Sequence, residues 1–169
     1  MYIKKFINLL KQGGKIMGKT AYEIQKERIK EIEEKASQLL DRCEVVTLAS
    51  INEKGYPRVC TITKIKNNGF AQIYFMTSKR SHLNGKATHF ENNTRASVCY
   101  NSGSDSVTLI GNVEIVTNMD EKRKFDKYCD RNFFKKGIED PKCYLLRFQT
   151  IEATFWIEGK FRTCKYKAK

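Results

Sequence analysis

The central part of the chain is a succession of short β-rich segments separated by turn sequences. Residues 45–51 are β-branched or apolar for the most part, and Asn52-Glu53-Lys54-Gly55 after them has the composition of a hairpin turn. Asn67-Asn68-Gly69 supplies another tight turn. The segments of this kind are residues 45–51, 57–66, 70–77, 95–100, 107–116, 143–148 and 152–157. The first three predict an antiparallel meander.

Strands on this spacing predict a small closed or split barrel, because antiparallel sheets of this size hide their edges by closing. Helices flank the strands. Thr20-x-x-Glu23 is a capping box that begins an amphipathic helix of about six turns. A second helix is expected from near Ser81 to Asn92 and a short third one over 120–132. The predicted fold class is mainly β (α+β), an antiparallel split β-barrel of six to seven strands with flanking helices.

The length of 169 residues suits one domain with a single core. We expect residues 20–159 to form this domain, 160–169 to be a basic C-terminal tail and 1–19 to be an extra N-terminal segment. The codons for Lys11-Gln-Gly-Gly-Lys-Ile-Met17 can spell a purine-rich sequence like a bacterial ribosome-binding site ahead of an ATG. This suggests the hypothesis that translation naturally starts at Met17.

The formal net charge of +13 favours phosphate-bearing partners: nucleic acid, anionic membrane or a nucleotide cofactor. Aromatic residues lie among basic ones at 133–136 and 165–167, a pattern compatible with single-stranded nucleic acid. The basic residues are otherwise scattered over the whole chain, which is typical of a solvated surface. The apolar run 6–10 is too short to cross a bilayer. We therefore expect no membrane partner and consider nucleic acid unfavoured.

The six cysteines are spread singly, without a C-x-x-C pair and without a histidine at zinc-site spacing. Most of them fall in apolar strands, where cysteine behaves as a small hydrophobic residue. We interpret them as reduced, structural and cytoplasmic. The two histidines, His82 and His89, lie seven residues apart on one predicted helix and are expected to face solvent. No catalytic triad, carboxylate pair or P-loop is present, and Gly111 predicts a bulge or a close approach within its strand.

Residues 73–86 have the pattern of a strand that runs into a loop of hydroxyls and cations and then into a helix. Thr77, Ser78 and Ser81 offer hydroxyl donors, and the cations are Lys79, Arg80 and Lys86. A helix that begins near Ser81 adds backbone N–H groups and the positive end of its dipole. The pattern is typical of a phosphate site, and an ordinary strand end with solvated charges is the alternative.

The order of these elements resembles the pyridoxamine 5′-phosphate oxidase-like family of FMN-binding split barrels, particularly its general stress protein branch. The resemblance covers about residues 36–157. It rests on four pieces in a specific order and spacing, namely Gly55-Tyr56-Pro57, Tyr74-Phe75-Met76-Thr77-Ser78 with Ser81 and Lys86 beyond it, Asn93-Thr94-Arg95-Ala96-Ser97-Val98, and Leu109-Ile110-Gly111-Asn112-Val113-Glu114-Ile115-Val116.

The resemblance implies that Thr77, Ser78 and Lys86 hold the phosphate of FMN, with Ser81 beside them. The loop from Ser81 to Lys86 is longer than is usual in the family, so Lys79 or Arg80 could take the place of Lys86. The strand that lines the flavin ring in the family corresponds here to Thr61, Ile62, Thr63 and Lys64, with Met76 beside the ring.

The resemblance also implies a homodimer with the flavins at the subunit interface. Trp156, the only tryptophan, could then stack near the flavin across the dimer, and packing in the core or interface is the commoner role for a single tryptophan.

A flavin supplies its own redox chemistry, so the protein needs no catalytic constellation. Vitamin B6 oxidation is doubtful, because the C-terminal segment 161–167 lacks the arginine-leucine-x-proline motif of the true oxidases. The resemblance therefore implies an FMN-dependent oxidoreductase that acts on an unknown small molecule with NAD(P)H as donor. A flavin- or haem-binding stress protein without turnover and a nucleic-acid-binding barrel are the alternatives.

Overall fold

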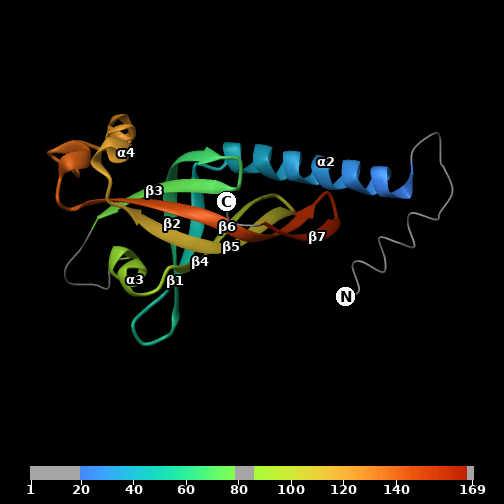
Figure 1. Cartoon of the computed structure of the whole chain (residues 1–169), viewed down its shortest axis with the longest axis horizontal. Coiled ribbons are helices and arrows are strands. Elements are labelled where there is room, and N and C mark those ends of the chain that lie inside the picture. Colours follow the sequence, from blue (N-terminus) through green and yellow to red (C-terminus); the bar gives the residue numbers. More distant parts are fainter. Residues whose placement is uncertain (1–19, 79–85, 167–169) are drawn as a thin grey trace.

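The computed structural model describes residues 20–78 and 86–166 of the chain (Figure 1). Its strands are β1 (Val45–Ile51), β2 (Pro57–Asn68), β3 (Gln72–Ser78), β4 (Arg95–Ser102), β5 (Asp105–Val116), β6 (Cys143–Ile157) and β7 (Lys160–Lys165). Its helices are α2 (Ala21–Arg42), α3 (Lys86–Asn92) and α4 (Met119–Arg123), followed by the 3-10 turns η1 (Asp126–Tyr128) and η2 (Gly137–Glu139). The predicted mainly β class is confirmed.

Six of the strands close into a barrel. The order along the sheet is β3-β2-β1-β4-β5-β6-β7, every pairing between these strands is antiparallel, and β3 also pairs with β6. The first part of β6 pairs with β3, from Cys143 opposite Ser78 to Gln149 opposite Gln72. Its last residues, from Glu152 to Ile157, pair with β7 instead. The predicted split barrel is therefore confirmed, with β7 as an extension beyond the closed ring.

Strand β6 corrects the prediction of two separate strands at 143–148 and 152–157. It is one strand of 15 residues, because Gln149, Thr150 and Ile151 contain no turn residue and the irregularity is taken up as a bulge. The extra residue of the bulge is Ile151 of β6, because Ile110 and Gly111 of β5 pair with Glu152 and Thr150. A Cβ atom at Gly111 would overlap the Gln149 carbonyl oxygen, so the predicted close approach is confirmed.

Strand β7 corrects the prediction that residues 160–169 are a basic tail. Glu158 and Gly159 both have positive φ, 50° and 71°, which is the requirement of a two-residue type I′ turn. The chain reverses there, and Lys160–Lys165 pairs with the end of β6. The predicted domain boundary at residue 159 thus falls inside a hairpin.

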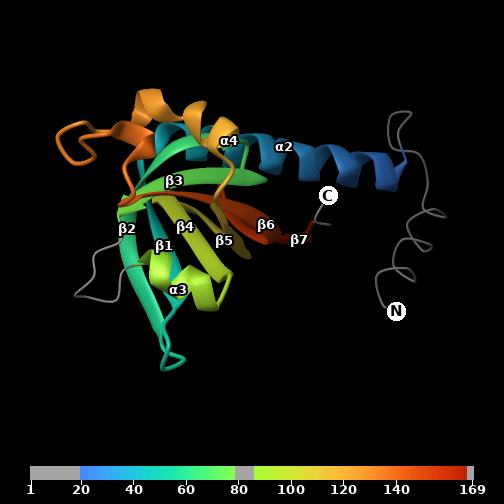
Figure 2. The same ribbon diagram turned by 60° about the vertical axis from the view of Figure 1, so that its left-hand side comes forward.

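Helix α2 begins at the predicted capping box. The Thr20 side chain accepts from the Glu23 amide, and the Glu23 carboxylate accepts from the Thr20 amide at 2.7 Å. Its buried residues all lie toward its C-terminal end and pack against the barrel core, namely Ile32, Ala36, Leu39 and Leu40. The N-terminal turns extend beyond the strands (Figures 1 and 2). None of the described helices is long and apolar enough to span a membrane.

The segment between β5 and β6 covers the outer side of β3 and the start of β6 (Figure 1). We predicted one helix over 120–132, and this is wrong. Helix α4 ends at Arg123, and turns follow, because Phe125 and Tyr128 are the only large apolar residues of that stretch. Arg147 of β6 fixes the segment by donating to Glu121 of α4 and to Glu114 of β5, each at 2.7 Å.

Candidate cofactor-binding site

An opening in the pairing of the barrel lies between β2 and β3. Their register runs from Asn68 opposite Gln72 to Lys64 opposite Phe75, with a bulge at Ile65, and no further pair joins them. Beyond this point the end of β3 pairs with β6 alone, and β2 pairs with β1. Within the part of the chain that the structure describes, the facing backbone edges of β2 and β3 therefore do not pair with each other beyond this point.

Four predicted cofactor residues lie on β2 at this opening. Thr61 and Thr63 are exposed on the outer face, whereas Ile62 points inward and packs against the barrel core. Lys64 is half-buried and is the last residue of β2 before the bulge. The alternation follows from the period of two in a strand. Outer-face threonines thus border one side of the opening.

Thr77 and Ser78 border the other side. They are the last residues of β3, and both are half-buried. The predicted residues Lys79, Arg80 and Ser81 lie outside the described residues. Lys86 is the first described residue of helix α3, which follows on the chain. The structure therefore places two hydroxyl groups at the strand end that precedes this helix.

Met76 has a different environment from the one predicted. Its side chain packs in a small apolar cluster on the outer side of β3, where its neighbours are Phe134, Ile138, Cys143 and Cys129. The side chain of Thr77 points to the opposite face of the strand. Packing thus accounts for Met76 in this chain, and its placement beside a flavin ring stays a prediction.

Trp156 is separated from the opening within one chain. Cys143, at the start of β6, pairs with Ser78, whereas Trp156 lies near the other end of the same strand, roughly 40 Å of extended chain away. Its ring is 44% exposed, and its neighbour on β7 is Phe161. Trp156 can therefore approach a cofactor only in an assembly of two chains.

Helix α3 lies across one end of the barrel (Figure 2) and is attached there by a polar contact that the sequence analysis missed. His89 is only 5% exposed, and its Nδ1 is hydrogen-bonded to the Ser50 hydroxyl of β1 at 2.8 Å. The prediction that His89 faces solvent is wrong, because the same helix face carries the buried residues Ala87 and Phe90. His82 lies outside the described residues.

A pocket of about 660 Å³ lies elsewhere, on the outer side of the β2–β3 hairpin under α4. Tyr74 and Phe125 form its apolar wall, with ring centroids 4.6 Å apart, and Lys66 lies over the Phe125 ring. None of the predicted cofactor residues lines it. Among the residues that the structure describes, no three His, Cys, Asp or Glu side chains are grouped as a metal site.

Comparisons with known proteins agree with this architecture. A family model described as pyridoxamine 5′-phosphate oxidase matches residues 32–157. A structure of a protein related to general stress protein 26 from Clostridium acetobutylicum is 18% identical, with a TM-score of 0.68, and the match covers 80% of this chain and 94% of that one. General Stress Protein 26 from Bacillus anthracis is 20% identical, with a TM-score of 0.60 and coverage of 79% and 98%.

A haem-binding protein from Mycobacterium smegmatis has the same fold, with 17% identity, a TM-score of 0.63 and coverage of 79% of this chain and 57% of that one. No curated protein sequence matches the chain. At these identities the structural matches establish the fold.

The contact between Ser50 and His89 gives a prediction about α3. We expect Ser50→Ala to lower the free energy of unfolding by about 1–2 kcal/mol, because it removes a buried hydrogen bond from the residue that attaches the helix to β1. Urea denaturation followed by circular dichroism measures this. Ser102→Ala, at an exposed position, is the control and should change stability by less than ~0.5 kcal/mol. Equal losses in the two variants would contradict a special role for the pair.

Proposed function

The chain belongs to the pyridoxamine 5′-phosphate oxidase family, and from this we propose that it is an FMN-dependent oxidoreductase that uses a nicotinamide donor to reduce a small molecule. The observation that carries the proposal is the separation of β2 from β3, which leaves Thr77 and Ser78 at a half-buried strand end that precedes α3 on the chain. Hydroxyl donors at such a position suit a phosphate group.

The phosphate of FMN would be held by the hydroxyl groups of Thr77 and Ser78, with Ser81 as a third donor. Positive charge would come from Lys86, at the first described position of α3, or from Lys79 or Arg80 in the loop before it. The net charge of +13 supports an anionic ligand in general. These donors fit a dianion because each contributes a hydrogen bond to charged oxygen.

The flavin ring would lie along β2 from Thr61 to Lys64, where unpaired backbone groups and outward threonines are available. The bound flavin supplies hydride transfer, so the chain need only hold and orient the ring and leave one face accessible. Lys64, half-buried at the bulge, is the cation of β2 nearest to the opening. Vitamin B6 is an unfavoured substrate, because residues 160–165 form an edge hairpin and lack the motif of the oxidases.

We further propose a homodimer that forms through the outer face of the barrel and completes the flavin site. Large apolar side chains are exposed across this face, on neighbouring strands, namely Val45, Val59, Ile110, Trp156 and Phe161. Val59 and Phe161 are each 66% exposed. Large exposed apolar side chains that share one face are typical of an interaction site. Because Thr61 and Thr63 share the outer face of β2 with Val59, a partner on this face would also cover the ring.

A binding protein without turnover is the second candidate, since one similar fold is that of a haem-binding protein. Among the described residues the one histidine, His89, is buried and bonded to Ser50, so it is poorly placed as an axial haem ligand. FMN is the favoured cofactor because of the family match. We propose a cytoplasmic location, because the six cysteines are spread singly along the chain and most of them lie in strands.

The phosphate site is tested by the double variant Thr77→Ala with Lys86→Ala. We expect its dissociation constant for FMN to rise by about 100-fold or more, since each hydrogen bond to a charged group contributes ~1.5–3 kcal/mol. Quenching of flavin fluorescence measures the affinity. Thr117→Ala with Lys135→Ala removes the same groups from exposed positions and is the matched control. Wild-type affinity in a folded Thr77/Lys86 variant would overturn the assignment.

The dimer is tested by Val59→Asp. The substitution places a carboxylate on the proposed interface, and we expect the dimer dissociation constant to rise by at least about tenfold because an unpaired charge is costly to bury. Sedimentation velocity measures the association. Phe133→Asp, on the segment between β5 and β6 and also exposed, is the control. A wild-type monomer, or equal effects of both variants, would contradict the proposed face.

A further inference from the structure

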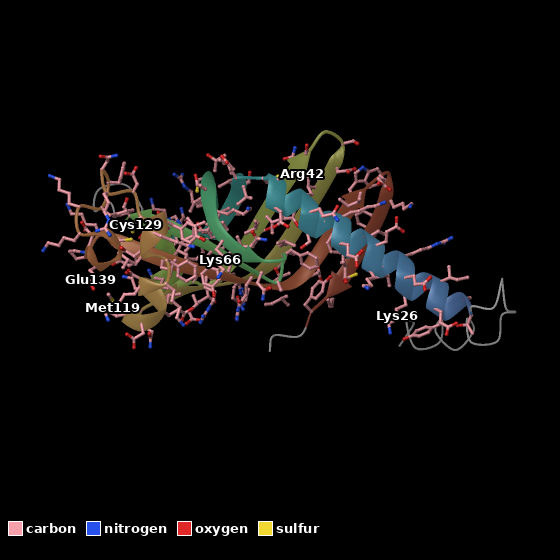
Figure 3. All side chains as sticks on the ribbon, turned by 90° about the horizontal axis from the view of Figure 1, so that it is seen from above. Lys26, Arg42, Lys66, Met119, Cys129 and Glu139 are labelled. Atoms are coloured by element: carbon pink, nitrogen blue, oxygen red, sulfur yellow. The ribbon has the colours of Figure 1, made fainter. Side chains whose placement is uncertain are left out.

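Three sulfur atoms converge on the outer side of β3. The Cys129 Sγ lies 3.2 Å from the Met76 Sδ and 3.8 Å from the Cys143 Sγ. Cys143 is buried, and the other two side chains are half-buried. Phe134 and Ile138 complete the cluster around them. Figure 3 shows Cys129 at the end of the molecule formed by α4 and the two 3-10 turns, close to Met119 and Glu139.

The three residues come from separate elements that the backbone holds in place. Met76 lies in β3, and Cys143 begins β6 opposite Ser78. The Cys143 amide donates to the Asp140 carbonyl at 2.8 Å, and the Cys129 amide donates to the Asp126 carbonyl at the end of η1 at 3.0 Å. The sulfur atoms are therefore preassembled by the fold, although their residues are 14 and 53 positions apart in the sequence.

Two thiols and a thioether are a soft ligand set. Such ligands select Cu(I), whereas Mg²⁺, Ca²⁺ and Mn²⁺ prefer oxygen. A structural zinc site takes four Cys, His or carboxylate ligands, and no such group occurs among the residues that the structure describes. Phe134 and Ile138 pack in the same cluster and contribute no further ligand atom. Only a soft cation that accepts three sulfur ligands matches the cluster.

We propose that Met76, Cys129 and Cys143 form a three-coordinate binding site for Cu(I). Binding takes up one Cu⁺ and releases the two thiol protons, so that the occupied site has one negative charge. Lys122 offsets this charge, since its Nζ donates to the Cys143 carbonyl at 3.3 Å. Arg131 also lies near Cys129, but its charge is paired with Asp126, so Lys122 is the cation that offsets the site.

The protonation state of the two thiols makes Cys129 and Cys143 poorly suited to act as a redox-active pair. Burial raises the pKa of the Cys143 thiol to about 12, and burial also raises the pKa of Cys129. Both cysteines are therefore protonated thiols near neutral pH, and a thiol is a poor nucleophile compared with a thiolate.

The test is an anaerobic titration of the full chain with Cu(I) in competition with the chelator bathocuproine disulfonate. We expect wild-type protein to withdraw one equivalent of Cu(I). Cys129→Ser should lower the affinity for Cu(I) by more than about 100-fold. Loss of a residue that only contacts a metal ligand lowers metal affinity by at most about 100-fold, so a larger loss identifies Cys129 as a ligand. Met76→Leu, which keeps the apolar volume of the cluster, should lower it by at least about 10-fold.

The control is Cys164→Ser, which removes a thiol that packs elsewhere, against the main barrel core. It should leave the titration unchanged. X-ray absorption at the copper edge should report three sulfur neighbours in the wild type and fewer in Met76→Leu, a readout that a change in packing alone would not produce. Copper that stays with the chelator in the presence of wild-type protein would overturn the proposal. Equal affinities of wild-type and Cys129→Ser protein would do so too. Neither result depends on FMN binding.

Discussion

Strand β6 is the constraint on which the rest of the structure depends. One of its edges pairs with β5 from Leu145 to Trp156, and the other pairs first with β3 and then with β7. The pairing with β3 closes the barrel beside the end of β3 that has no pairing to β2, where the bulge at Ile65 interrupts the β2–β3 ladder. The exchange of partner along β6 lies at the other end of β3, between Gln149 and Glu152, and it forms the hairpin that carries Trp156 and Phe161.

The same pairing links the two proposed sites. Cys143 lies opposite Ser78, so the sulfur cluster and the candidate phosphate site are on neighbouring residues of one ladder. The segment from α4 to η2 is attached above them by Arg147, whose ion pairs with Glu114 and Glu121 raise its pKa against the opposing effect of burial. The guanidinium is charged at every working pH, so this attachment persists whenever the two carboxylates are ionised.

Structural elements that are specified by a few adjacent residues, such as turns and helix caps, could be predicted from the sequence. The turn at Asn52 was predictable because its side chain accepts from the Lys54 and Tyr56 amides, and Gly55 has the positive φ that such a turn requires. The capping box and the close approach at Gly111 were predictable for similar reasons. The continuity of β6 was not, because the bulge at Ile151 that permits it depends on the pairing with β5, and the Glu158-Gly159 turn is a weaker signal than Asn-Gly.

The positions of the candidate site residues in the fold could be predicted only in part, for the same physical reason. The hydroxyl groups at the end of β3 could be placed because a strand end is specified by residues adjacent in the sequence. The burial of His89 could not be predicted, because it depends on how α3 packs against β1. The sulfur cluster could not be predicted from cysteine spacing, because tertiary packing brings together Met76, Cys129 and Cys143. The exposed apolar residues of the outer face could not be predicted as a group either, because they come from several strands that are brought together only by folding.

A crystal structure of the protein soaked with FMN tests the central claim most directly. The account predicts the phosphate within hydrogen-bonding distance of the Thr77 and Ser78 hydroxyls, with the ring along residues 61–64 of β2 and a second subunit against its other side. Density for FMN in the pocket between Tyr74 and Phe125, or side chains of the chain itself filling the opening between β2 and β3, would contradict it.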